Sequence, residues 1–345
     1  MIPLKCKIAC FVPPHYDYLT STLIEGLVGL GHICAGLEDA NHVEKVGKKK
    51  FKFFLKSCDL IIIFQGSLVN CDFLDITEST IKVFVDGSDL PSISKMPDAT
   101  FNYVFKRELL AVINRNYSQP IYPLQFGIES RYEQIQKTDF QWSVSFIGSM
   151  SNFQRLAVQE YLKSLNDPCI FTGTTGERSY NGSAGLPLPT PKYFNLLNNS
   201  FASIDIPGLG WDCGRTWEIL GSGALLIQFR SELIYSSKLV ENEHFIGFSS
   251  LGELDKIILS IRNDLNHYNK IRKNGYKFAR KHHSSKARAV YFMDVIDNET
   301  PSNTKGTRQN RSKIFQNYRK KIYLGQTYIV DKIRSRVNRR HQPQV

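Results

Sequence analysis

Long apolar runs are missing from this chain. No stretch reaches the roughly 18 consecutive apolar residues that a membrane-spanning helix needs. The first residues, Met1–Cys6, form neither a long apolar segment nor a small-residue cleavage site, so they do not resemble an export signal. These absences predict a cytoplasmic protein, and a hydrophobic content of 42% is enough for ordinary buried cores.

Cysteine pairs at metal-binding spacing are also absent. The sequence has seven cysteines but no Cys-x-x-Cys. Most of them lie in or beside apolar, strand-like runs, which is typical of small buried residues in a reducing compartment. A structural zinc site is therefore not expected.

Acidic residues are scarce at the C-terminal end. Residues 301–345 contain twelve Lys or Arg and one acid, Asp331, whereas the other 300 residues hold 32 basic and 31 acidic residues. The net charge of +12 therefore belongs almost wholly to this segment. A nearly neutral body argues against a broad nucleic-acid-binding face, so nucleic acid is not the expected partner.

The apolar runs of the body are short and rich in β-branched residues. Clear examples are Lys5–Val12, Asp59–Phe64, Ile81–Val85, Val144–Ile147 and Ala224–Ile227. Helical or loop segments separate them, which predicts parallel strands joined by crossovers and covered on both faces. Because 345 residues exceed the size at which one core usually splits, we expect an α/β fold with two domains.

One stretch, Gly208–Gln228, combines a glycine-rich loop, a helix start, a helix and a buried strand. Asp212 can cap the helix, and Arg215 and Glu218 lie three residues apart on it. A helix N-terminus beside a parallel strand is suited to bind a phosphate group. The alternative is an Arg-Glu pair on an exposed helix, although the neighbouring Trp217 favours burial of the helix.

Several strand-like runs end in short polar or glycine turns. Gly148-Ser149, Gly173-Thr174 and Pro207-Gly208 each follow such a run. In open parallel sheets, ligands bind beyond the carboxyl ends of the strands, where these turns must lie. Any one of them is explained by ordinary turn chemistry, but together they predict a binding site.

The same segments resemble group 1 glycosyltransferases, especially the spore-maturation CgeB-like branch. The resemblance rests on an R-x-x-E-x-x-x-x-G-x-L pattern formed by Arg215, Glu218, Gly223 and Leu225, and it covers roughly residues 144–296. It implies the GT-B architecture, in which two Rossmann-like domains face each other across a cleft. On this basis we expect an acceptor domain over 1–130, a nucleotide-sugar domain over 142–297, and a basic tail over 298–345 that is helical or disordered.

The resemblance also implies roles for individual residues. Glu218 would bind the ribose hydroxyls of the donor, and Arg215 would neutralise its diphosphate. No cofactor is implied, because the nucleotide-sugar is a substrate, and no Asp-x-Asp motif typical of metal-dependent relatives occurs. The complete set of expected donor-binding residues is Gly148, Ser149, Arg155, Gly173, Gly214, Arg215, Thr216 and Glu218.

The chain departs from the family pattern at one position. Many group 1 enzymes carry a second glutamate eight places before the one matched by Glu218, but Gly210 stands there. Asp212 is the nearby carboxylate and becomes a candidate catalytic residue. The candidate base is His15, in the turn after the first strand, with Asp17 close enough to orient it; a solvated loop histidine is the alternative.

Two basic amphipathic elements suggest a membrane surface. Lys48–Lys56 places Phe51, Phe54 and Leu55 on one helix face, and the tail from 311 to 340 interleaves apolar and basic residues. For the first element, inward packing of the Phe residues is the stronger interpretation; for the tail, nucleic-acid contact and disorder compete. We therefore expect a glycosyltransferase, cytoplasmic or peripheral on the inner face of the membrane, acting on a glycan or lipid-linked acceptor. The rival hypothesis is a catalytically silent GT-B-like glycan- or nucleotide-binding assembly protein.

Overall fold

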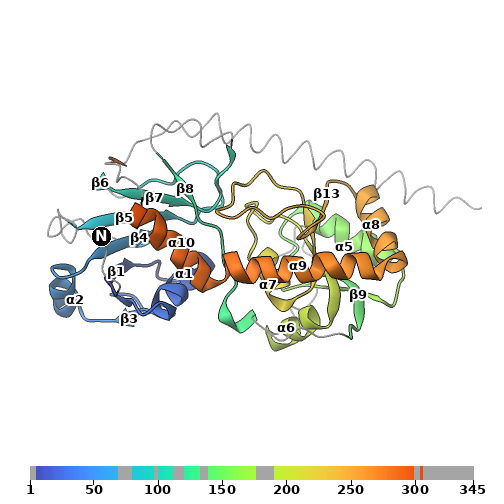
Figure 1. Ribbon diagram of the computed structural model, residues 1–345, viewed down its shortest axis with the longest axis horizontal. Helices are drawn as coiled ribbons and strands as arrows, with labels where there is room; N and C mark the ends of the chain where they lie inside the picture. Colours follow the sequence, from blue (N-terminus) through green and yellow to red (C-terminus); the bar gives the residue numbers. More distant parts are fainter. Residues whose placement is uncertain are drawn as a thin grey trace, which may run out of the picture.

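The structure, a computed structural model, describes residues 5–68, 80–96, 100–111, 120–132, 139–175 and 190–298, together with the backbone of 304–305. Within these ranges the chain forms two α/β halves that lie side by side along the long axis of the molecule (Figure 1). Apart from those two positions and residue 298, the expected basic tail lies outside the described residues.

The N-terminal half is built on a seven-stranded sheet of order β3-β2-β1-β4-β5-β7-β8, in which every strand pair is parallel. Two strands outside it, β6 (Thr100–Phe101) and β14 (Thr304–Lys305), form an antiparallel pair. The elements of the main sheet and its helices are β1 (Lys7–Phe11), α1 (Tyr18–Gly29), β2 (Ile33–Gly36), β3 (Glu44–Lys45), α2 (Lys48–Leu55), β4 (Leu60–Phe64), β5 (Ile81–Asp86), β7 (Tyr103–Lys106) and β8 (Tyr122–Pro123).

Strand β4 shows why these runs are continuously apolar. All five of its residues are buried, and successive side chains point to opposite faces of the sheet. Leu60, Ile62 and Phe64 join the core under α1, whereas Ile61 and Ile63 join the core under α2. A parallel sheet covered on both faces follows directly from this pattern.

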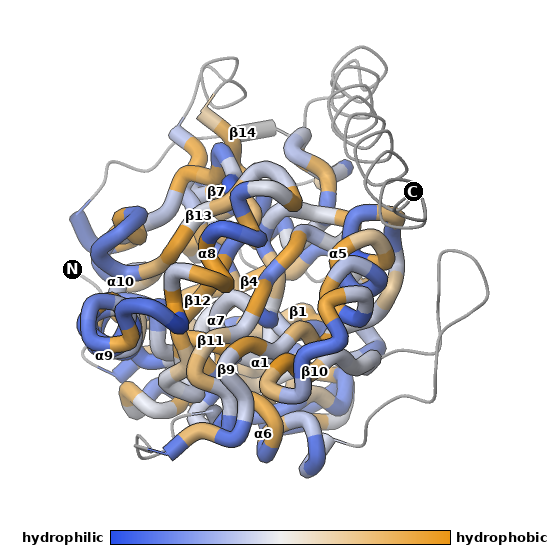
Figure 2. Tube along the Cα trace, turned by 90° about the vertical axis from the view of Figure 1, so that its right-hand side faces the viewer, coloured by the Kyte–Doolittle hydropathy of each residue, from blue (hydrophilic) through white to orange (hydrophobic). Residues whose placement is uncertain are grey.

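The C-terminal half is built on a five-stranded sheet of order β10-β9-β11-β12-β13, again with every pair parallel. Figure 2 shows these strands as largely hydrophobic and the outer helix α9 as largely hydrophilic. The elements from the linker onward are η1 (Ser130–Tyr132), β9 (Trp142–Ile147), α5 (Phe153–Ser164), β10 (Ile170–Gly173), α6 (Thr190–Asn198), β11 (Ser200–Asp205), α7 (Gly214–Ser222), β12 (Leu225–Phe229), β13 (Ile246–Phe248), α8 (Leu251–Asn263), α9 (Leu265–His283) and α10 (Ser285–Asn298).

The last described helix returns to the first half of the chain. α9 runs along the C-terminal half, and α10 continues from it to lie beside α1 (Figure 1). Ala289 and Phe292 of α10 are fully buried in the same core as Leu23 of α1. The contact is close because Gly26 has no side chain: a Cβ there would lie 2.0 Å from the carbonyl oxygen of Ser285.

The predicted α/β class is confirmed, and both halves have the predicted parallel sheets. In the described part of the chain, no helix is long and apolar enough to cross a bilayer. The domain limits drawn at 130, 142 and 297 stay a prediction. Helix α10 falls within the range predicted for the C-terminal domain, but it packs on the N-terminal core.

Candidate active site

Several predicted site residues lie at the carboxyl edge of the C-terminal sheet. Strands β9 and β10 end together, and the N–H of Gly148 donates to the carbonyl of Gly173 at 3.3 Å. Strand β11 pairs with β9 and ends at Asp205, and Ser149 follows Gly148 at the same edge. Ligands of open parallel sheets bind beyond this edge, where Gly214 begins α7.

Arg215 is buried at this edge and spans from β11 to β9. Its side chain is 8% exposed, and its Nη1 lies 3.6 Å from Oδ1 of Asp205. The guanidinium also covers Gly148, since a Cβ there would lie 1.8 Å from Nη2 of Arg215. The exposed Arg-Glu pair considered from the sequence is therefore wrong: Arg215 is buried, and the carboxylate in ion-pair range is that of Asp205.

Two atoms of this pair have unused hydrogen-bonding capacity. Within the described ranges, neither Nη1 of Arg215 nor Oδ1 of Asp205 has a hydrogen-bond partner. Burial by itself lowers the pKa of Arg215, but Asp205 together with the nearby Tyr193, Cys213 and Glu218 outweighs burial, so the pKa lies above its ordinary value. Arg215 is thus a charged, buried group whose Nη1 makes no hydrogen bond to the described residues, and a buried cation with unused donor capacity suits an anionic ligand.

Thr216 lies next to Arg215 but is directed into the protein. Its hydroxyl donates to Oδ2 of Asp205 and accepts from Nε2 of Gln228 at 3.2 Å. Thr216 is only 1% exposed. Thr216 therefore ties α7 to β11 and β12, and its predicted contact with the donor is left without support from this geometry.

Arg155 braces the loops that follow β9 and β11. Its Nε and Nη2 donate to the carbonyl of Ile206 at 3.1 and 2.9 Å, and its Nη1 donates to the carbonyl and hydroxyl oxygens of Ser149 at 3.1 and 3.0 Å. Burial and the nearby Arg215 lower the pKa of Arg155. Because these hydrogen bonds are made within the protein, Arg155 supports the two loops at the edge of the site. Its predicted contact with the donor stays a prediction.

Glu218 is held by two tyrosines. Its Oε1 accepts from the hydroxyl of Tyr132 at 2.7 Å, and its Oε2 accepts from the hydroxyl of Tyr193. Burial raises the pKa of Glu218, although both hydrogen bonds act in the opposite direction. The hydroxyl of Tyr18, from the N-terminal half, is buried nearby and has no hydrogen-bond partner among the described residues.

The start of α7 meets the N-terminal half. A Cβ on Gly214 would lie 3.7 Å from the ring of Tyr18, at the beginning of α1. The turn that contains His15 directly precedes this helix, and His15 is exposed in it. Asp17 is the N-cap of α1: its Oδ2 accepts from the N–H and hydroxyl of Thr20, both at 2.7 Å. Its carboxylate therefore serves the helix, and its predicted orientation of His15 is not seen.

Asp212 has a different role from the predicted helix cap. The N-cap of α7 is Cys213, without a side-chain hydrogen bond. The Asp212 carboxylate instead accepts from the N–H of Phe126 at 2.8 Å and from Nε1 of Trp217 at 3.0 Å. Burial raises its pKa to about 6. Asp212 is 4% exposed with both oxygens bonded, so in this structure it joins the two halves.

Sequence reasoning missed Glu108, which follows β7 in the N-terminal half. Its carboxylate accepts from the N–H groups of Trp211 and Asp212, both at 2.9 Å. It lies where a side chain at position 210 would begin, because a Cβ on Gly210 would be 2.4 Å from Oε1 of Glu108. The available signal was the charged run from Lys106 directly after an apolar strand; these side chains are buried.

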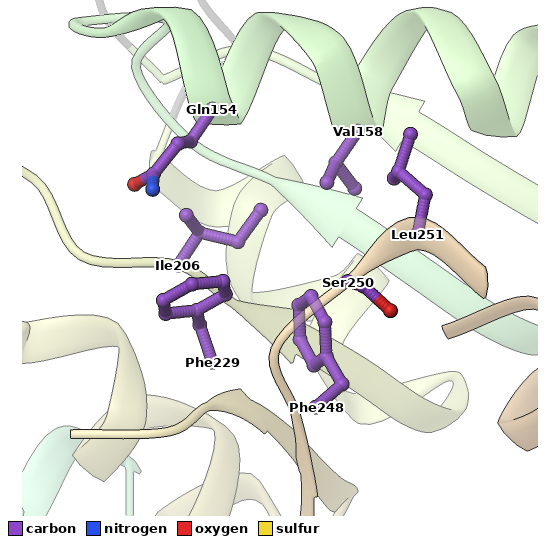
Figure 3. A pocket seen from close by; sticks show the side chains of 7 residues that line it. All are labelled: Gln154, Val158, Ile206, Phe229, Phe248, Ser250 and Leu251. Atoms are coloured by element: carbon purple, nitrogen blue, oxygen red, sulfur yellow. The ribbon is translucent and has the colours of Figure 1, made fainter. Parts of the chain in front are cut away.

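A small apolar hollow lies at the ends of β11, β12 and β13 (Figure 3). The space open to the centre of a water molecule is about 10 Å³, which is room for about one water. In this form it does not accommodate a nucleoside. Its walls are formed by Gln154, Val158, Ile206, Phe229, Phe248, Ser250 and Leu251.

Carboxylates and histidines do not gather into a metal centre in the part of the chain that the structure describes: no group of three or more His, Cys, Asp or Glu side chains could hold an ion there. The charged groups of the site pair with one another instead. Arg215 pairs with Asp205, and Arg107 pairs with Glu108 at 3.0 Å.

Comparisons with known proteins identify the fold. No family model and no curated protein matches the sequence. Among solved structures, the chain is similar to Anabaena HepE in complex with UDP and glucose, with a TM-score of 0.58 and 10% identity over 85% of this chain and 100% of that one. It is also similar to a glycosyltransferase from Rickettsia africae, with a TM-score of 0.58 and 11% identity over 86% of this chain and 100% of that one. For HepE in complex with UDP-glucose, the TM-score is 0.55 and the identity 10%, over 85% of this chain and 99% of that one. The predicted GT-B architecture, with two Rossmann-like domains, is thereby confirmed.

Proposed function

We propose that this protein is a glycosyltransferase that moves a sugar from a nucleotide-sugar donor to a glycan or lipid-linked acceptor. The observation that carries the proposal is Arg215: a buried cation with one nitrogen that makes no hydrogen bond to the described residues, at the first turn of α7 and the carboxyl edge of a parallel sheet. The fold is similar to that of Anabaena HepE, solved with UDP-glucose and with UDP and glucose, and to that of the Rickettsia africae glycosyltransferase. The motifs at Arg215 and Glu218 support the CgeB-like branch within this proposal.

The chemistry requires stabilisation of a departing nucleoside diphosphate. The N–H groups at the start of α7 and the Arg215 guanidinium supply positive potential for the diphosphate oxygens without a metal ion. Gly214 has no side chain at the first position of α7, which permits close approach there. Glu218, with Tyr132 and Tyr193 on its oxygens, is placed to exchange those hydroxyls for ribose hydroxyls.

The acceptor would enter from the N-terminal half. His15 is our candidate base, because it is exposed in the turn that leads into α1, and Tyr18 at the start of that helix contacts the start of α7. Asp212 supports the site by joining both halves, since its oxygens are already bonded. His15→Gln should lower turnover with little effect on donor affinity; loss of donor affinity instead would count against a role as base.

A membrane surface is a second proposed partner, favoured by α2. Phe51 and Leu55 pack into the core, as inward packing of this helix predicts, but Phe53 is 64% exposed, with Lys49 and Lys56 one helical turn away on the outer face. A lone aromatic among lysines fits an anionic lipid interface. Sedimentation with phosphatidylglycerol vesicles should weaken in Phe53→Ser and with the tail from residue 306 removed; unchanged sedimentation in both would contradict this partner.

Calorimetric titration with UDP, GDP and their glucose derivatives tests the main proposal. We expect wild type to bind at least one of them and Arg215→Met to lose on the order of tenfold or more in affinity. Arg230→Met is the matched control, because Arg230 is a surface arginine paired with Glu241 and Glu253. No binding of any nucleotide would overturn the proposal. Binding without release of free sugar or transfer to any acceptor would favour the silent assembly protein.

A further inference from the structure

Glu108 occupies the space of the acid that position 210 lacks. We propose that it is a positioning residue: from the N-terminal half, its carboxylate holds the loop from Pro207 to Cys213 and thereby sets the start of α7 that receives the donor. That the start of α7 receives the donor rests on the proposed function. That Glu108 holds the loop rests on the contacts alone.

The carboxylate binds two successive backbone groups of the loop. Its Oε2 accepts from the N–H of Trp211, and its Oε1 accepts from the N–H of Asp212, both at 2.9 Å. Glu108 itself is fully buried. A buried carboxylate with two amide donors fixes the direction of both peptide planes, because either donor left alone would be costly.

The glycine at position 210 is needed for this approach. A Cβ there would lie 2.4 Å from Oε1 and 2.8 Å from Cδ of Glu108, closer than atoms can come. A side chain at position 210 therefore requires the Glu108 carboxylate to leave the position in which it holds the loop. The glycine that breaks the family pattern is the residue that admits a carboxylate from the other half.

Arg107 completes the hold. Its Nη1 lies 3.0 Å from Oε1 of Glu108 and donates to the carbonyl of Asp212 at 2.7 Å, while its Nη2 pairs with Asp89. The Arg107 side chain is 2% exposed. The charge on Glu108 is thus balanced within the N-terminal half, so that no part of the loop has to supply a cation.

Two hydrogen bonds in sequence connect Glu108 to α7. Asp212, fixed through its N–H, accepts from Nε1 of Trp217 on α7. Gly214 and Arg215 lie between these two residues in the sequence, so their backbone position depends on both. Movement of Glu108 would consequently shift the N–H groups that we assign to the diphosphate.

Glu108→Gln, Gly210→Ala and a double variant with Glu108→Ala test the role. Glu108→Gln keeps the size but turns one acceptor into a donor facing an N–H. Gly210→Ala keeps Glu108 but removes its space. In a Glu108→Ala background, the Gly210→Ala change should matter much less, because the clashing carboxylate is gone. Glu253→Gln is the matched control: Glu253 also accepts from a backbone N–H, that of Ser249, and pairs with Arg230 away from this loop.

Hydrogen–deuterium exchange of peptides covering 207–217 and calorimetry with UDP are the readouts. We expect Glu108→Gln and Gly210→Ala to speed exchange in these peptides and to weaken UDP binding on the order of tenfold, whereas Glu253→Gln does neither. Unchanged exchange would overturn the hold on the loop, whether or not wild type binds UDP. Faster exchange with unchanged UDP affinity would overturn the positioning role. A wild type that binds no nucleotide would overturn the proposed function, and exchange would still decide the hold.

Discussion

The guanidinium of Arg215 lies directly over the backbone of Gly148. Position 148 has no room for a side chain, since a Cβ would be 1.8 Å from Nη2 and 2.3 Å from Cζ. This contact connects the first turn of α7 to the end of β9. The glycine therefore fixes where the buried positive charge lies, as well as the shape of the turn.

Gly148→Ala should displace Arg215 from this position. Because the clash is with the end of a long side chain, we expect the arginine to move and the fold to survive. Affinity for a nucleotide-sugar should fall on the order of tenfold or more, measured by calorimetry. Gly47→Ala is the control, as nothing lies within 4 Å of its added Cβ. Equal donor affinity in both variants would refute the importance of the contact.

Tyr193→Phe should destabilise the protein through Glu218. The substitution removes a donor from a buried carboxylate oxygen, which costs about 1–3 kcal/mol, and it raises the pKa of Glu218 further. Urea unfolding at neutral pH measures the loss. Tyr276→Phe removes a hydroxyl at the surface of α9 and should cost no more than about 0.5 kcal/mol. Similar losses of unfolding free energy in the two variants would show that the hydrogen bond from Tyr193 to the buried Glu218 carboxylate does not stabilise the fold.

Glu108 should make stability fall as the pH rises. Burial raises its pKa to about 7, so between roughly pH 4.5 and 7 the folded chain binds a proton that the unfolded chain releases. The stability contributed by this group is complete below the unfolded pKa and is lost as pH rises through about 7. The slope is at most about 1.4 kcal/mol per pH unit. Glu108→Gln should flatten the curve of unfolding free energy between pH 5 and 8; a slope equal to wild type would contradict the assignment.

Gly26→Ala should weaken the contact between α1 and α10. The added Cβ would lie 2.0 Å from the carbonyl oxygen of Ser285, and backbone cannot yield as a side-chain tip can. We expect a loss of about 1–3 kcal/mol or more in thermal or urea unfolding. Gly29→Ala on the same helix has nothing within 4 Å and should be neutral or stabilise by up to about 1 kcal/mol. Equal stability of the two variants would exclude tight packing at Gly26.

Most of the fold could be predicted from local patterns. The apolar runs at 59–64 and 144–147 correspond to β4 and β9, because a strand buried on both faces has a distinctive composition. The end of α7 is also encoded locally: the helix ends at Ser222, and Gly223 adopts the left-handed φ of 79° that favours glycine. The convergence of Gly148, Gly173 and Arg215 at one edge followed from parallel topology.

The remaining features depend on contacts between distant residues. Asp212 was expected to cap the helix that it precedes, but Phe126 and Trp217 offer its carboxylate better-placed donors. Glu108 lies 104 residues from its partner Asp212, and no local pattern encodes that separation. A short buried strand such as β7, which ends in charged residues, is similarly hard to distinguish from a loop.

The return of α10 also has a consequence for biosynthesis. The core beneath α1 needs Ala289 and Phe292, both fully buried, so it stays open until those residues have left the ribosome. The whole C-terminal half is synthesised in the meantime, and it can fold while the earlier half still exposes an apolar face. The half that is translated first is thus completed last. We expect expression to depend on chaperones that cover the apolar face during this time.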